Sequence, residues 1–271
     1  MRNFSVIVLF LSALGSPLIA QDSLDELANS PGLAFETDQS EPLITFDRFG
    51  GLRVPPPADW KPTPLLTVLP DGTIRSGSDR PGIVPREGKL TREQLYQLLD
   101  FVVKQNDFYQ ADTASIKAEM ENAGNRIRIA DALTSKFTVN LKRGSHTVEV
   151  YALMFNVDQY PGIPVLRRLL AIEKRLKLEY ALVQIGNDAA VKKILDAVNQ
   201  ELKQKRPDMK PFQRQDIIYG LRKSNGDLAV NLMKETVDKE TQKLATQVNA
   251  NYGKKTNDAE PTVGLYIRDG K

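Results

Sequence analysis

Hydrophobic and polar residues alternate along several short stretches of the chain, and this period of two predicts β-strands. The first stretch runs from Leu43 to Arg48, and further stretches flank Asp71-Gly72 and Arg143-Gly144-Ser145. Asp-Gly between two such stretches predicts a hairpin, because both residues tolerate the positive φ values of tight turns. The pattern therefore predicts antiparallel pairing within this part of the chain.

Helices are predicted where apolar residues recur every three or four positions. The first helix begins at Thr91, where Thr91 and Gln94 have the spacing of a capping box, and it ends at Asn106-Asp107. A short polar helix fits residues 114–123, and a longer helix carries Pro164 in its first turn. The element order predicts an α+β domain over residues 42–180, with helices packed on one face of an antiparallel sheet.

A second, smaller unit is predicted from residue 187 to residue 271. Its helix carries apolar residues from Val191 to Leu202, and Asn225-Gly226 lies between two alternating runs. Further alternation at 244–250 and 263–267 predicts a helix followed by a four-stranded meander. Because its contacts would be mostly local, we expect residues 187–271 to fold alone. The apolar run Tyr180-Ala181-Leu182-Val183 leaves open a contact between the units or one continuous helix.

The first twenty residues have the pattern of a secretory signal peptide. Arg2 precedes an apolar run from Phe4 to Leu14 that is shorter than the roughly 20 residues of a membrane-spanning helix. Cleavage after Ala20 or after Gly15 fits the pattern, and an uncleaved anchor is the alternative. Residues 21–41 are acidic and are predicted to be a flexible leader. We therefore expect a secreted or periplasmic protein with no transmembrane span in the mature chain.

The composition excludes several classes of chemistry. The chain has no cysteine and a single histidine, His146. Disulfides, thiolate metal sites and cysteine nucleophiles are therefore excluded, and a Ser-His-Asp arrangement would have to use His146. The formal net charge of +3 gives no electrostatic argument for nucleic acid as a partner.

The remaining motifs favour structural roles. Gly50-Gly51 precedes a proline-rich segment instead of a helix, so it is interpreted as the end of a strand and not as a phosphate loop. His146 is interpreted as an exposed or half-buried strand residue, with Ser145 on the opposite face. Glu119 and Glu121 would diverge around a helix. The sequence thus predicts no catalytic, cofactor-binding or metal-binding residues, and no cofactor.

Four segments resemble a module found in exported, uncharacterised bacterial proteins. They read ITFDRFGGLR, LTVLPDGTIRSG, GKLTREQLYQLLDFVVKQNDFY and FTVNLKRGSHTVEVYAL, and the resemblance covers residues 42–178. The proline-rich insert at 55–64 departs from the shorter loop that the module implies. The C-terminal unit is similar in element order to cystatin-like and PepSY-like folds. These motifs are structural, so the resemblance transfers no catalytic residue.

The expected function is an exported, non-catalytic binding or scaffold role at the bacterial cell envelope, with an unknown protein or an envelope polymer as partner. One alternative is a hydrolase that attacks an envelope polymer through two carboxylates. Another is an inhibitor-like or propeptide-like role for the C-terminal unit. Two acids that face each other across a deep cleft would favour the hydrolase, and a shallow exposed apolar patch would favour binding.

Overall fold

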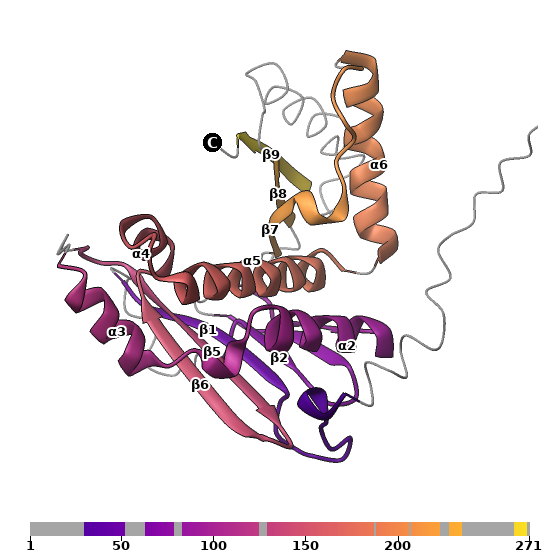
Figure 1. Cartoon of the computed structure of the whole chain (residues 1–271). Coiled ribbons are helices and arrows are strands. Elements are labelled where there is room, and N and C mark those ends of the chain that lie inside the picture. The colour runs from indigo at the N-terminus through magenta and orange to yellow at the C-terminus, as the bar shows by residue number, and fades with distance from the viewer. Residues whose placement is uncertain are drawn as a thin grey trace, which may run out of the picture.

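Helix α5 (Pro164–Ile185) lies between two β-sheets and is the central element of the fold (Figure 1). The computed structural model describes residues 30–51, 63–78, 83–124, 129–186, 188–205, 207–222, 228–234 and 263–269. The predicted α+β class is confirmed by the antiparallel six-stranded sheet and its helices.

The larger sheet has six antiparallel strands in the order β4-β3-β2-β1-β5-β6. Their bounds are β1 Ile44–Gly50, β2 Leu66–Val68, β3 Thr73–Ser76, β4 Arg86–Lys89, β5 Leu133–Leu141 and β6 Gly144–Tyr151. The hairpins predicted at Asp71-Gly72 and at residues 143–145 are confirmed. Strand β4 was not predicted, because Arg-Glu-Gly-Lys at a sheet edge has no apolar alternation to recognise.

Helices cover one face of this sheet (Figure 1). The helical segments are α2 Arg92–Asp100 with its π-helical continuation η2 Phe101–Gln105, η3 Phe108–Gln110, α3 Thr113–Asn122, α4 Leu153–Gln159 and α5. The capping box at α2 is confirmed: Gln94 N donates to Thr91 Oγ1 over 3.1 Å, and Thr91 N donates to Gln94 Oε1 over 2.9 Å. Pro164 is at the start of α5, as predicted.

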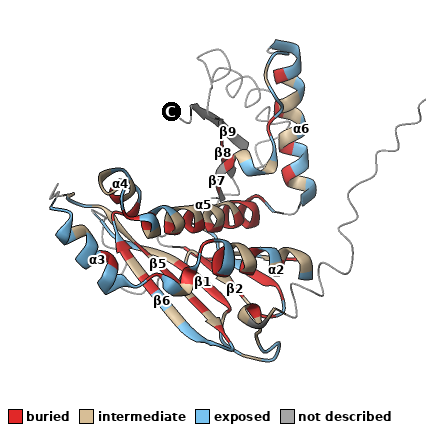
Figure 2. Ribbon diagram, in the orientation of Figure 1, coloured by how far each residue is buried: buried red, intermediate tan, exposed pale blue. Residues whose placement is uncertain are grey.

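The main core lies between the sheet and these helices (Figure 2). On the sheet side, alternate residues such as Phe46, Phe137 and Val148 are fully buried. On the helix side, Leu98 and Leu166 are equally buried. The opposite face of the sheet carries polar side chains, including the ion pair between Lys136 Nζ and Glu149 Oε1 at 2.9 Å.

The folded unit begins before Pro42, where the sequence pattern placed its start. A short 3₁₀ turn, η1 (Pro31–Leu33), buries Leu33 completely in the main core, and the Phe35 ring packs against Tyr96. Residues 30–35 therefore do not belong to the flexible leader predicted for 21–41, because they contribute apolar contacts. The predicted signal peptide, residues 1–20, lies outside the described residues.

The second sheet has three described strands in the order β7-β8-β9. The elements of this unit are α6 Asp188–Lys205, η4 Arg214–Asp216, β7 Ile217–Arg222, β8 Leu228–Lys234 and β9 Val263–Asp269. Strands β7 and β8 form the predicted antiparallel pair, but β8 and β9 are parallel neighbours. The meander prediction is wrong at this point, because a meander joins antiparallel neighbours and a parallel pair cannot be joined by a short hairpin turn. The strand predicted at 244–250 and the turn at Asn225-Gly226 lie outside the described residues.

A second hydrophobic core includes the last turns of α5. Ala181, Leu182 and Ile185 pack there with apolar residues of α6, β7 and β8. Gly220 of β7 lies so close to α5 that an added Cβ would be 2.7 Å from the Ala181 carbonyl oxygen. The predicted division into 42–180 and 187–271 therefore passes beside residues of α5 that belong to the second core, and this shared core argues against independent folding of residues 187–271. No helix in the described part of the chain has the length and apolar character that membrane crossing requires.

Candidate functional site

His146 has a structural environment. It is half-buried, as predicted, and its Nε2 lies 2.6 Å from the carbonyl oxygen of Ala111. The imidazole stacks on the Tyr109 ring with centroids 5.3 Å apart, and the guanidinium of Arg143 lies 3.7 Å from the centroid of the Tyr109 ring. These contacts join the segment before α3 to the edge strand β6. They give His146 a structural role.

The other sequence-selected residues also have structural positions. Gly50 and Gly51 end strand β1 with φ values of 79° and 73°, which confirms the interpretation as a strand end. Glu119 and Glu121 are exposed on α3, as expected for a solvated helix surface. In the part of the chain that the structure describes, no three His, Asp or Glu side chains gather as metal ligands.

A closed polar cluster surrounds Glu173 between α5 and the six-stranded sheet. Its Oε2 accepts a 2.5 Å hydrogen bond from Ser135 Oγ, and its Oε1 forms an ion pair with Lys177 and lies 3.8 Å from Arg48 Nε. Burial alone would raise the pKa of Glu173, but Lys177, Ser135 and Arg48 together hold that pKa below its ordinary value. The sequence contained a signal for this cluster, because Glu173 interrupts the apolar face formed by Leu169 and Leu176.

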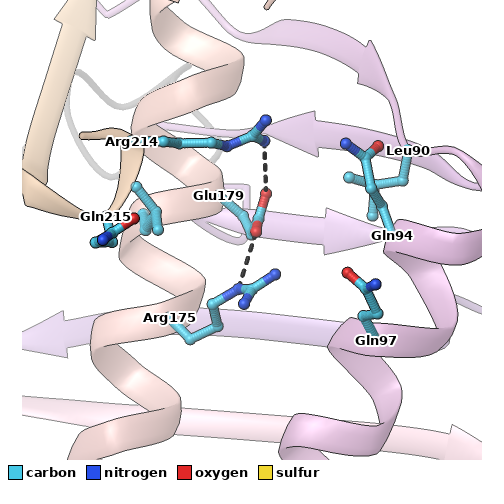
Figure 3. Close-up of a pocket in the computed structure, with 8 residues that line it drawn as sticks. Leu90, Gln94, Gln97, Arg175, Glu179, Arg214 and Gln215 are labelled. Carbon is cyan, nitrogen blue, oxygen red and sulfur yellow. Dashed lines mark hydrogen bonds and ion pairs between the residues drawn. The ribbon is translucent and has the colours of Figure 1, made fainter. Parts of the chain in front are cut away.

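A pocket of about 270 Å³ opens farther along α5, between α2, α5 and η4 (Figure 3). It is lined by Leu90, Gln94, Gln97, Arg175, Leu178, Glu179, Arg214 and Gln215. Glu179 is almost completely buried. Its Oε1 accepts a 3.0 Å hydrogen bond from Arg175 Nε, and its Oε2 lies 4.0 Å from Arg214 Nη2. The pocket therefore brings together side chains that are more than a hundred residues apart in the sequence.

Two glutamines of α2 present opposite hydrogen-bonding groups to this pocket. The oxygen of Gln94 is engaged by Thr91 N in the capping box, and the nitrogen of Gln97 donates to Glu93 Oε1 over 2.9 Å. Figure 3 shows the Gln94 nitrogen and the Gln97 oxygen on the side of the pocket that faces Glu179 and Arg175. The local hydrogen bonds of α2 thus fix one donor and one acceptor toward the same space.

The charges around the pocket balance one another. Arg214 Nη1 also pairs with Asp188 Oδ1 at 2.8 Å, so two guanidinium groups face two carboxylates. Among the eight lining residues, Glu179 is the only acidic one. A two-carboxylate mechanism would need a second acid on the opposite wall. The lining instead suits a ligand held by hydrogen bonds.

A second hollow, of about 490 Å³, is lined by residues of 36–41 and by the β5–β6 hairpin. Three of its residues are acidic, Glu36, Asp38 and Glu41, and all three are exposed. This hollow therefore lacks the deep cleft that would favour a hydrolase.

Large apolar side chains are exposed at the end of the six-stranded sheet where β1 and β6 finish. They are Phe49, Tyr151, Met154 and Phe155, with exposed fractions of 41%, 44%, 57% and 49%, and we call them the apolar end residues. Phe49 and Tyr151 both lie opposite Thr134 of β5, so they share the sheet face that points away from α5. Met154 and Phe155 follow at the start of α4.

No relatives guide the interpretation of these places. Comparison with protein-family models, with curated proteins and with solved structures found no match for this chain.

Proposed function

We propose that this protein is an exported, non-catalytic binding or scaffold protein of the bacterial cell envelope, and that it contacts its partner through the apolar end residues. The partner is a protein or an envelope polymer. The signal-like N-terminus motivates export into the periplasm or the medium. The observation that carries the binding role is the exposure of these large apolar side chains at one end of a well-packed sheet.

Apolar side chains that are exposed to water carry a free-energy cost, and a partner that covers them removes this cost. Each square ångström of apolar surface removed from water stabilises a complex by roughly 25 cal/mol, so a partner that covers several large side chains gains from their burial. Phe49 and Tyr151 lie two strands apart on an open sheet face, which separates them by roughly 10 Å. An extended apolar or aromatic segment of a partner protein, or two successive sugar rings of a polymer, can span that distance.

The hydrolase alternative has less support from the described residues. The pocket at Glu179 has one carboxylate on its wall, and that carboxylate already binds two arginines. The acids of the second hollow are exposed. An inhibitor-like role for the C-terminal unit gains no specific contact that favours it.

The test compares binding by the full chain and by two variants. One variant carries Phe49→Ser, Met154→Ser and Phe155→Ser. Tyr151 is retained because its hydroxyl donates to the Ile129 carbonyl and accepts from Ala132 N, so its loss would disturb the loop before β5. The control is Val84→Ser, since Val84 is an exposed apolar residue outside the end group, with an exposed fraction of 40%.

Binding is measured by sedimentation with purified envelope polymer and by crosslinking to envelope proteins, followed by titration with the partner obtained. We expect the triple variant to bind at least about tenfold more weakly and the control to bind like the parent. Equal binding by all three chains would overturn the apolar contact, and release of soluble fragments from the polymer would establish the hydrolase instead. Sequencing of the mature N-terminus tests export separately, because a chain that retains Met1 in the cytosol contradicts it.

A further inference from the structure

We infer that the pocket around Glu179 is a binding site for a small, uncharged, hydroxyl-rich ligand, of the class of a single sugar residue. This site is distinct from the apolar end residues, and the inference does not depend on them or on export. It rests on three observations: the arrangement of donors and acceptors, the balance of charge, and the size and position of the pocket.

Donors and acceptors alternate around the pocket. Gln94 offers an amide nitrogen and Gln97 an amide oxygen, and the second polar atom of each is held within α2. On the opposite wall, Arg175 binds Glu179 through Nε, so its two terminal nitrogens remain as donors toward the pocket side of α5. A hydroxyl group donates one hydrogen bond and accepts others, so a ring with adjacent hydroxyls can satisfy both walls.

The orientation of these groups is set before a ligand binds. A free glutamine side chain samples many rotamers, and ordering it on binding costs roughly 0.5–1.5 kcal/mol. Here the bond from Thr91 N to Gln94 Oε1 restrains the side chain of Gln94, and the bond to Glu93 restrains that of Gln97. Glu179 is nearly buried, and Arg175 is held by it at one end. A ligand therefore binds to side chains that are already ordered in the folded protein.

The charge balance selects against strongly anionic ligands. Both arginines on the wall have carboxylate partners, Arg175 with Glu179 and Arg214 with Asp188. A phosphate would have to displace these carboxylates or bind close to them, which costs Coulomb energy. A neutral polyhydroxyl ligand adds hydrogen bonds without breaking the ion pairs.

The size and position of the pocket agree with this class. About 270 Å³ lies just below the range of roughly 300–1,000 Å³ for pockets that hold drug-sized ligands, so one sugar ring is the appropriate size. Leu90 and Leu178 provide apolar surface for the carbon face of such a ring. One wall comes from α2 and the opposite wall from α5 and η4, and because η4 belongs to the second unit, an occupant would connect both units.

The experiment uses the full chain and titration with N-acetylglucosamine, glucose and inorganic phosphate, followed by calorimetry and by amide signals in NMR. The variant is Gln97→Leu, which keeps the size of the side chain and removes the acceptor. The control is Gln105→Leu, because Gln105 makes the same kind of bond, from its Nε2 to Asp100 Oδ2 at 2.8 Å, but does not line the pocket.

We expect at least one of the two sugars to bind, with amide shifts in α2 and around residues 214–216, and phosphate to bind more weakly. Loss of one hydrogen bond to an oriented group should weaken sugar binding about tenfold in Gln97→Leu and leave Gln105→Leu unchanged. Absence of sugar binding at concentrations up to about 100 mM would overturn the inference. Tighter binding of phosphate, or equal sugar binding by the two variants, would overturn it as well.

Discussion

Helix α5 carries two buried glutamates that differ in almost every other respect. Glu173 lies against β1 and β5, and its partners Ser135, Lys177 and Arg48 all belong to the larger unit. Glu179 lies six residues later, and its partners Arg175 and Arg214 come from the two units. The first carboxylate closes a packed interface, whereas the second forms the wall of an open pocket.

The difference shows that burial of a charge does not by itself indicate a binding site. Glu173 is satisfied from all sides by rigid elements, and it lines neither of the two pockets described above. Glu179 is equally buried, but it faces side chains on elements far apart in sequence. A buried ion whose neighbours leave space, and come from separate units, is the better candidate for ligand binding.

The largest expected effect comes from cutting the chain after α5. A fragment of residues 187–271 loses Ala181, Leu182 and Ile185, which form one wall of the second core. We now expect it to lack a cooperative unfolding transition, contrary to the expectation from the sequence, because a unit of this size has little apolar surface to spare. Calorimetry measures the transition. A longer fragment that begins at Lys177 is the control, and a sharp transition in the shorter one would contradict the shared core.

The next largest effect is expected at Glu173. Replacement Glu173→Ala leaves Lys177, Arg48 and Ser135 without their common acceptor in a buried interface, and we expect the free energy of unfolding to fall by about 3–5 kcal/mol. Urea unfolding measures the change. Glu179→Ala is the matched comparison, and a smaller loss is expected because Arg214 keeps its second carboxylate partner, Asp188. Equal losses would remove the distinction between the two glutamates.

A smaller effect is expected at the contact between β7 and α5. Replacement Gly220→Ala places a methyl group 2.7 Å from the Ala181 carbonyl oxygen, and neither backbone can yield without a shift. We expect a loss of about 1–3 kcal/mol. Hydrogen exchange should show the loss in β7 and β8, with the six-stranded sheet unchanged. Gly162→Ala is the control, because an added Cβ there meets no atom within 4 Å and its φ, like that of Gly220, is not positive.

The smallest effect is expected in the pH dependence of stability. The pKa of Glu173 is lower in the folded chain than its ordinary value, so its contribution is complete above about pH 4.3 and declines as the pH falls toward the lowered pKa. Glu173→Gln should therefore flatten the stability profile below about pH 4.3. Unfolding by urea at several pH values measures the slope, and an unchanged slope would mean that Glu173 does not titrate in this range.

The sequence predicted most of the larger unit because its signals are local. Alternation located β1, β5 and β6, and the Thr91–Gln94 spacing located the start of α2. Strand β4 was not predicted because its residues are polar. The parallel pairing of β8 with β9 was not predicted because alternation contains no information on the relative direction of two strands. The burial of Leu33 was not predicted, because a single apolar residue in an acidic stretch shows no hydrophobic periodicity.

The pocket was not predicted, since its walls meet only after folding. Gln94 had been interpreted only as part of the capping box, and Arg214 lies in a short 3₁₀ turn without periodicity. In the sequence, Glu173 and Glu179 were the residues that could have indicated buried polar sites along this helix. Both lie within a long run that is otherwise rich in Leu, Ile and Ala, where an acidic side chain is expensive to bury unless it has partners. A search for charged residues on the apolar face of a long helix would have found Glu173.

The position of α5 between two sheets also has a consequence for the order of synthesis. When the chain has been made only as far as Gly186, the six-stranded sheet and its main core can already assemble, because every strand of that sheet precedes α5. Ala181, Leu182 and Ile185 then remain uncovered until β7 and β8 have been made. A premature stop codon between the codons for Gly186 and Leu228 would therefore give a product in which the larger unit folds while the apolar end of α5 stays exposed and promotes aggregation.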